Sequence, residues 1–214
     1  LRIVLILSFS LLAPAAPPKP EIPRLKVAID PGHGGEDAGA KGPKGLREKE
    51  TALELALALK ESLEGHGFEV FMTRADDTFV PLWDRAKLAN DAGADLFISL
   101  HLNGAKARSA KGSEVFFLSL DQGDRDAAEL VEVENSASGP HPVSDSVLDT
   151  ILQDLAQKAY LQESERLAVN VQLELNRLGG IKERGVKQAG FVVLRGAAMP
   201  AVLVEVSFIS NPVE

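Results

Sequence analysis

Two of the four histidines in the chain follow directly on strand-like segments. His33 stands in the segment 30–35 (DPGHGG), after the apolar run 25–29, and His101 follows the run 95–100. The glycines around His33 allow positive φ and close backbone approach, so its imidazole can point into an open site. An imidazole in such a place can ligate a metal or act as a base. The two positions therefore indicate one site at one edge of one sheet.

Two glutamates extend this set. Glu48 lies fifteen residues after His33, at the first turn of a predicted helix, and Glu205 stands alone in the apolar run 201–206. A carboxylate among aliphatic residues is costly to desolvate unless it is paired or close to a cation. Two imidazoles with one carboxylate form a common catalytic zinc set, and a second carboxylate can then serve as general base.

The spacing alone leaves other interpretations open for these residues. His33 could be a loop histidine with its hydrogen bonds satisfied, and His101 could bind the backbone at the end of its strand. Glu48 alone could be no more than a favourable charge at a helix N-terminus. Two further histidines, His66 and His141, are expected in surface loops.

The composition limits the function classes. The 214 residues are 45% hydrophobic, which is enough for one sizeable core in a single domain. The formal net charge is −8 and no Lys/Arg-rich block is present, so a nucleic-acid partner is not expected. The chain has no cysteine, so a metal would have to be held by His, Asp or Glu.

The first 24 residues are expected to lie outside the folded domain. Arg2, the apolar run 3–12 and the small residues of 13–16 are typical of a secretory signal peptide over residues 1–16. A buried helix or an uncleaved anchor is the alternative, although the apolar run is short for a membrane span. Residues 17–24 are proline-rich and predict an extended tether. We therefore expect a secreted chain, in the periplasm, without a stable membrane span after cleavage.

Both ends of the sequence look unnatural. The chain begins at Leu1 without an initiator methionine and stops at Glu214, two residues after Pro212. We expect the C-terminal end of the domain, taken as residues 25–214, to be truncated.

The remaining pattern alternates strands and helices. Strands are predicted at 25–29, 68–73, 95–100, 113–120, 191–195 and 201–206, and helices at 48–65, 82–92, 125–135 and 146–178. This order is typical of a single α/β domain, with a twisted, mostly parallel or mixed sheet and helices on both faces.

Several segments together resemble a known family. They are 29–35 (IDPGHGG), 45–49 (GLREK), 98–103 (ISLHLN), 185–195 (GVKQAGFVVLR) and 203–211 (LVEVSFISN). In this order they resemble the zinc-dependent N-acetylmuramoyl-L-alanine amidases of the Amidase_3 type, including periplasmic cell-wall amidases, over residues 25–214.

The resemblance implies an activity and its residues. His33, Glu48 and His101 match the zinc ligands, and Glu205 matches the catalytic glutamate. The implied reaction is hydrolysis of the amide bond between N-acetylmuramic acid and the L-alanine of the stem peptide in peptidoglycan. A monomer is expected.

The segment 123–147 occupies the position at which some periplasmic relatives carry a blocking helix. In those relatives a glutamate covers the zinc until an activator with an inactive LytM-type domain displaces it. The resemblance makes Glu129, Glu132 and Glu134 candidates, with Glu134 favoured by its place before Asn135. A solvated acidic helix face is the alternative.

Two other functions remain as alternatives. The first is a catalytically silent peptidoglycan-binding module of the same fold, against which the presence of all four site residues argues. The second is a phosphate-binding protein that uses the glycine-rich loop 32–45. The helix after that loop lacks a Gly-Lys-Ser/Thr signature, which argues against this second function.

Overall fold

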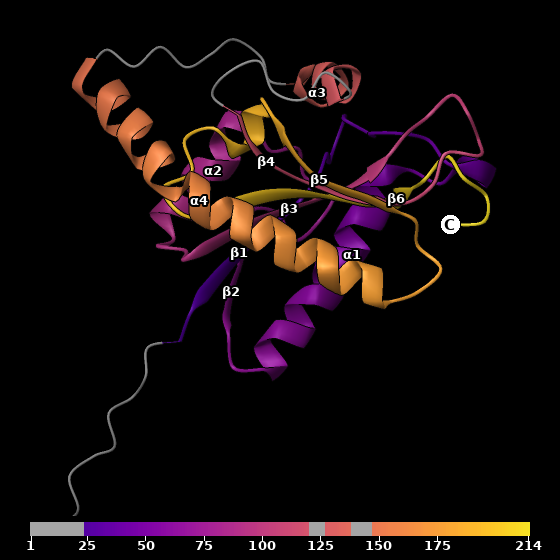
Figure 1. Cartoon of the computed structure of the whole chain (residues 1–214), viewed down its shortest axis with the longest axis horizontal. Coiled ribbons are helices and arrows are strands. Elements are labelled where there is room, and N and C mark those ends of the chain that lie inside the picture. Colours follow the sequence, from indigo (N-terminus) through magenta and orange to yellow (C-terminus); the bar gives the residue numbers. More distant parts are fainter. Residues whose placement is uncertain (1–23, 120–126, 138–146) are drawn as a thin grey trace, which may run out of the picture.

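The computed structural model describes residues 24–119, 127–137 and 147–214. The predicted signal peptide, residues 17–23 of the predicted tether and His141 lie outside these described residues. The described chain forms one α/β domain, in which helices cover both faces of a single sheet (Figure 1). The predicted fold class is confirmed.

The sheet has six strands in the order β2-β1-β3-β6-β4-β5. Their bounds are β1 (Lys26–Pro31), β2 (Glu69–Met72), β3 (Leu96–Asn103), β4 (Ser113–Leu118), β5 (Glu183–Ala189) and β6 (Ala201–Phe208). Strands β2, β1, β3 and β6 are mutually parallel, whereas β4 runs antiparallel to β6 and parallel to β5. The sheet is therefore mixed, and its parallel part ends along one edge.

Two long helices cover one face of the sheet. They are α1 (Glu48–Gly65) and α4 (Val147–Arg177). Ala56 of α1 and Ala168 of α4 are fully buried in a cluster with side chains of alternate strand positions, such as Ile29 and Val204. Because strand side chains alternate between faces, the intervening residues point to the opposite face.

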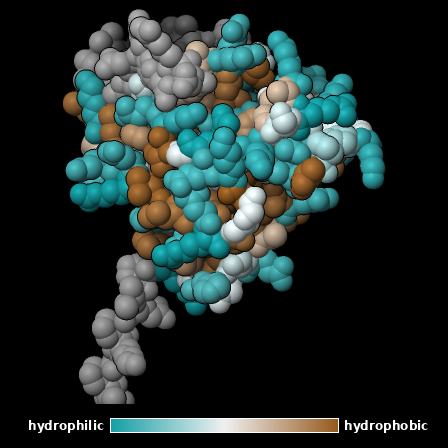
Figure 2. Space-filling model, turned by 45° about the vertical axis from the view of Figure 1, so that its right-hand side comes forward, coloured by the Kyte–Doolittle hydropathy of each residue, from teal (hydrophilic) through white to brown (hydrophobic). Residues whose placement is uncertain are grey.

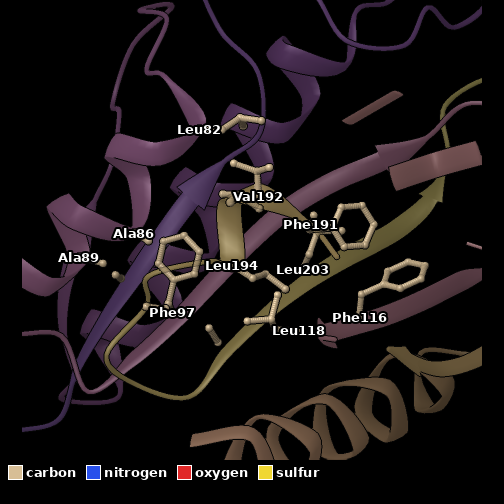
Figure 3. Packing of buried hydrophobic residues seen from close by; sticks show 14 of the residues in the cluster. Leu82, Ala86, Ala89, Phe97, Phe116, Leu118, Phe191, Val192, Leu194 and Leu203 are labelled. Carbon is tan, nitrogen blue, oxygen red and sulfur yellow. The ribbon is translucent and has the colours of Figure 1, made fainter. Parts of the chain in front are cut away.

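The opposite face is covered by α2 (Leu82–Asp91), α3 (Ala128–Asn135) and the short 3-10 turn η3 (Val192–Leu194). Figure 3 shows this cluster, in which Phe97 of β3 and Leu203 of β6 lie among residues of α2 and η3. Phe116 and Phe191 meet edge to face at 5.1 Å between ring centroids. His101 and Glu205 share strand parity with Phe97 and Leu203, so they belong to this face.

One strand prediction was wrong. Residues 191–195 do not form a strand, because Val192–Leu194 is a 3-10 turn whose side chains are buried between α2 and the sheet. The sixth strand is instead β5, a polar segment at the edge of the sheet. A short apolar run is compatible with either a buried strand or a buried turn, and edge strands need few apolar residues.

The helix predictions were close. The helix predicted at 48–65 matches α1, and the one predicted at 146–178 corresponds to α4. The short 3-10 turn η1 (Pro43–Gly45) precedes α1. In the described part of the chain no helix is long and apolar enough to cross a membrane. Figure 2 shows polar side chains over much of the face in view, with apolar residues between them.

Candidate metal centre beside a buried glutamate

The four predicted site residues come from four elements that meet at one edge of the sheet. His33 follows β1, His101 lies near the end of β3, and Glu48 is the first residue of α1. Glu205 of β6 is paired in register with His101. The carboxyl ends of neighbouring parallel strands lie at the same edge, so residues far apart in sequence converge there.

Four side chains form a compact cluster. His33 Nε2 lies 3.0 Å from Glu48 Oε1, and His101 Nδ1 lies 3.2 Å from the same oxygen. Glu134 of α3 completes the group, with its Oε2 3.4 Å from His33 Nε2 and 3.0 Å from His101 Nδ1. One ligand atom from each residue lies within 4.8 Å of the others. The structure thus brings the three predicted zinc ligands together with one of the predicted regulatory glutamates.

The donor atoms are those that a zinc ion requires. His33 Nε2 and His101 Nδ1 are buried and have no hydrogen-bond partner in the described part of the chain, although both face carboxylates. These ring nitrogens and the facing carboxylate oxygens converge without hydrogen bonding to one another. Such an arrangement is expected where the atoms bind one cation together. Two imidazoles and one or two carboxylates are a common zinc donor set.

Groups behind the cluster orient these donors. His33 Nδ1 lies 2.9 Å from Asp37 Oδ2, which leaves Nε2 directed into the cluster. Glu48 accepts hydrogen bonds from the backbone N–H groups of Ala40 at 2.8 Å and Leu102 at 2.9 Å. Such outer contacts fix the ring tautomer and the carboxylate plane in metal sites.

The cluster carries a strong negative potential. Burial opposes charge on His33, but Asp37 and Glu48 outweigh it and raise its pKa to about 9. Burial also opposes charge on His101, yet Glu134 and Glu48 raise its pKa well above its ordinary range. Burial alone would raise the pKa of Glu48, but the two histidines lower it well below its ordinary range. Carboxylates that favour protonated imidazoles would favour a metal cation in the same way.

The loop that carries His33 is held in a strained conformation by buried arginines. His33 has φ of 58°, which is uncommon for a residue other than glycine. Arg85 donates to the His33 carbonyl at 2.8 Å, and Arg74 donates to the Gly32 carbonyl at 2.6 Å. A Cβ on Gly32 would stand 2.6 Å from the His101 ring. Glycine is therefore required there for the two histidine-bearing segments to approach.

Glu205 lies beside the cluster and is fully buried. Neither of its carboxylate oxygens has a hydrogen-bond partner among residues 24–119, 127–137 and 147–214. Burial raises the pKa of Glu205 well above its ordinary range, an effect that His101 opposes and Glu134 reinforces. A carboxyl group in this environment is suited to exchanging a proton with a bound reactant.

Helix α3 packs over the cluster and brings Glu134 into it. Asn135 anchors the end of the helix, because its side chain donates to the Gly190 carbonyl at 3.1 Å and accepts from the Val192 N–H at 2.8 Å. Of the three candidate glutamates, only Glu134 contacts the cluster, whereas Glu129 and Glu132 are exposed.

One buried carboxylate near the site was missed from the sequence. Glu114 of β4 is paired in register with Glu205 and is 2% exposed. The signal was present, because Glu114 is the one charged residue of β4, as Glu205 is of β6. Among the remaining histidines, His66 is exposed at the end of α1, as predicted.

Comparisons with known proteins identify a single family. Residues 27–214 match the family described as Amidase_3, N-acetylmuramoyl-L-alanine amidase. The chain is 41% identical over 195 residues to N-acetylmuramoyl-L-alanine amidase AmiC of Neisseria meningitidis, covering 89% of this chain and 47% of that protein. It is 39% identical over 193 residues to AmiA of Escherichia coli, covering 88% of this chain and 67% of that protein.

A solved structure agrees with this match. The N-acetylmuramoyl-L-alanine amidase of Clostridium difficile superposes with a TM-score of 0.67 at 30% identity, over 89% of this chain and 83% of that chain. The chain spans about half the length of the Neisseria relative, so the remainder of that protein has no counterpart in these residues.

Proposed function

Because the chain belongs to the Amidase_3 family of N-acetylmuramoyl-L-alanine amidases, we propose that it is a zinc-dependent peptidoglycan hydrolase. The bond cleaved is the amide between the lactyl group of N-acetylmuramic acid and the L-alanine of the stem peptide. The observation that supports this most strongly is the convergence of His33, Glu48 and His101 beside the buried Glu205.

The residues divide the chemistry between them. His33, Glu48 and His101 would hold zinc, which supplies Lewis-acid chemistry by acidifying water and polarising a carbonyl oxygen. A cation in the neighbouring cluster would oppose the effect of burial on the pKa of Glu205 and favour its ionised form. In that form Glu205 accepts the proton of the attacking water and returns it to the departing amine of L-alanine. Its burial keeps bulk water away, so the proton passes between Glu205 and the reactants.

Zinc-dependent release of stem peptides tests this function. The purified chain loaded with zinc is expected to release stem peptides from purified cell wall, with new free amino groups on L-alanine. Chelation should abolish the release and added zinc should restore it, because the three ligands hold the metal reversibly. A catalytically silent wall-binding module would instead sediment with the wall and release nothing, with or without zinc.

We further propose that the described arrangement is a closed state. Glu134 Oε2 lies 3.4 Å from His33 Nε2 and 3.0 Å from His101 Nδ1, so it would take a coordination position that hydrolysis requires to be open. An activator with an inactive LytM-type domain would displace α3. Export to the periplasm, directed by residues 1–16, would bring the chain to its substrate.

Replacing Glu134 with Ala is expected to raise basal wall hydrolysis by roughly 10-fold or more. The coordination position that Glu134 would occupy is then open without displacement of α3 by an activator. The rate of stem-peptide release without any activator measures this, with zinc content determined in parallel. The matched control is Glu132→Ala, which removes an exposed glutamate two residues away on α3. Equal basal rates in both variants, with full zinc content, would contradict the inhibitory role.

A further inference from the structure

The structure places a second set of charged residues next to Glu205. Glu114 faces Glu205 across the β4–β6 pair and lies on the same face of the sheet. Its Oε1 accepts a hydrogen bond from Asn103 Nδ2 at 2.8 Å and lies 3.1 Å from Arg184 Nε. Its Oε2 accepts from Lys187 Nζ at 2.7 Å. One buried carboxylate thus holds two cations, which leaves one positive charge in excess within this group.

The two cations are built into the sheet and still reach solvent. The side chain of Arg184 is 32% exposed and that of Lys187 is 16% exposed. The β4–β5 register shifts so that Glu114 pairs with Gly185, which makes Arg184 the additional residue of a bulge. Bulges redirect side chains next to functional sites. Glu114 and the bulge thus fix both cations on the site face.

Aromatic rings support the same orientation. The Arg184 guanidinium lies 5.0 Å from the centroid of Phe208, and Lys187 Nζ lies 5.9 Å from that of Phe116. A stacked guanidinium keeps its edge available for a planar anion. Glu214 also approaches Phe208, but its two oxygens accept hydrogen bonds from the backbone N–H groups of Phe208 and Gly112.

An anionic substrate needs such cations at this site. The chain has a formal net charge of −8, so a negatively charged peptide gains from a local positive group on the surface that it approaches. Stem peptides of peptidoglycan carry free carboxylates, so the charge pattern fits this substrate class.

We propose that Lys187 and Arg184, positioned by Glu114, form a subsite that binds a carboxylate of the stem peptide. This inference rests on the proposed amidase function. Strand β5 lies two strands from β6, or roughly 10 Å at about 4.8 Å per strand. An extended peptide covers that distance in about three residues. The subsite would therefore bind a carboxylate that belongs to one of the first few residues after the scissile amide.

Paired substrates test the subsite. The rates kcat/KM are compared for muropeptides whose internal stem carboxylate is free or amidated, and separately for those whose C-terminal carboxylate is free or amidated. Zinc-loaded protein carrying Glu134→Ala provides an open site in every assay. We expect about a 10-fold preference for one free acid, mainly in KM, because hydrogen bonds to charged groups are stronger than neutral ones. The arm that shows the preference identifies which carboxylate is bound.

The variants are Lys187→Met and Arg184→Gln, and in each the ratio of kcat/KM for the free acid to kcat/KM for the amide should fall towards one. Lys182→Met is the control, because it removes an exposed lysine just before β5. This variant is expected to keep the full preference for the free acid. The double variant Glu114→Gln/Lys187→Met avoids leaving a buried carboxylate underpaired and should also lose the preference.

The possible results separate the two proposals. Equal rates on acid and amide substrates in both arms would overturn the subsite while leaving the amidase function intact. A preference that survives in Lys187→Met, Arg184→Gln and the double variant would overturn the assignment to these residues. Absence of hydrolysis of every substrate would overturn the proposed function and the subsite with it.

Discussion

Glu205→Gln is expected to lower the rate of stem-peptide release by about 100-fold or more, while the protein stays folded and retains zinc. A general acid–base group typically contributes 10²–10⁴ to the rate, and glutamine cannot accept the proton of water. The two side chains have the same shape, so packing in the buried position of Glu205 is preserved. Within the described residues the Glu205 carboxylate has no hydrogen-bond partner, so its removal leaves none of them unsatisfied.

Three measurements are needed for this prediction: the rate on purified wall, the zinc content and the thermal unfolding midpoint. Glu54→Gln is the matched control, because Glu54 is exposed on α1 and its replacement is chemically identical. A Glu205→Gln protein that hydrolyses wall at nearly the rate of Glu54→Gln would show that the proton acceptor is another group.

The second large effect concerns the metal. His33→Ala, Glu48→Ala and His101→Ala are each expected to weaken zinc binding by at least about 100-fold, since loss of outer contacts alone costs 10- to 100-fold. Activity should fall with zinc occupancy in each variant. The expected loss is greatest for Glu48→Ala, because its oxygen Oε1 faces both histidines and its backbone contacts hold the helix start against Ala40 and Leu102.

Metal content after dialysis against a chelating buffer measures this effect, and circular dichroism shows whether each variant is folded. His66→Ala serves as the control, because His66 is exposed and its Nδ1 lies 2.7 Å from the Ser62 carbonyl of its own helix. Full zinc content in all three folded variants would mean that the cluster is not the metal site.

The sequence predicted the convergence of the site because its residues carry local signals. His33 and His101 follow apolar strands, and the carboxyl ends of parallel strands meet at one edge. Glu205 was identified because a carboxylate in an apolar run needs a specific environment. Glu134 was favoured over Glu129 and Glu132 by its place before Asn135, and the structure shows Asn135 anchoring the end of α3.

Other features depend on packing between distant segments and have no local signal. The polar strand β5 is recognisable only once β4 is present as its partner. The turn at Val192–Leu194 is apolar because α2 covers it, not because it forms a strand. His33, with its positive φ, carries no local signal of its long-range partner, because its carbonyl accepts a hydrogen bond from Arg85, which lies more than fifty residues away in the sequence. Tertiary contacts of this kind override local pattern.

The position of β6 has a consequence for biosynthesis. β6 is the last described strand in the chain, yet it lies at the centre of the sheet between β3 and β4. Before residues 201–208 emerge, the strands can pair only as two separate ribbons, β2-β1-β3 and β4-β5. Chains are made from the N-terminus, so the three proposed zinc ligands are translated long before the carboxylate of Glu205. The proposed site can therefore be completed only after β6 has entered the sheet, and chains that end before residue 201 are expected to be inactive.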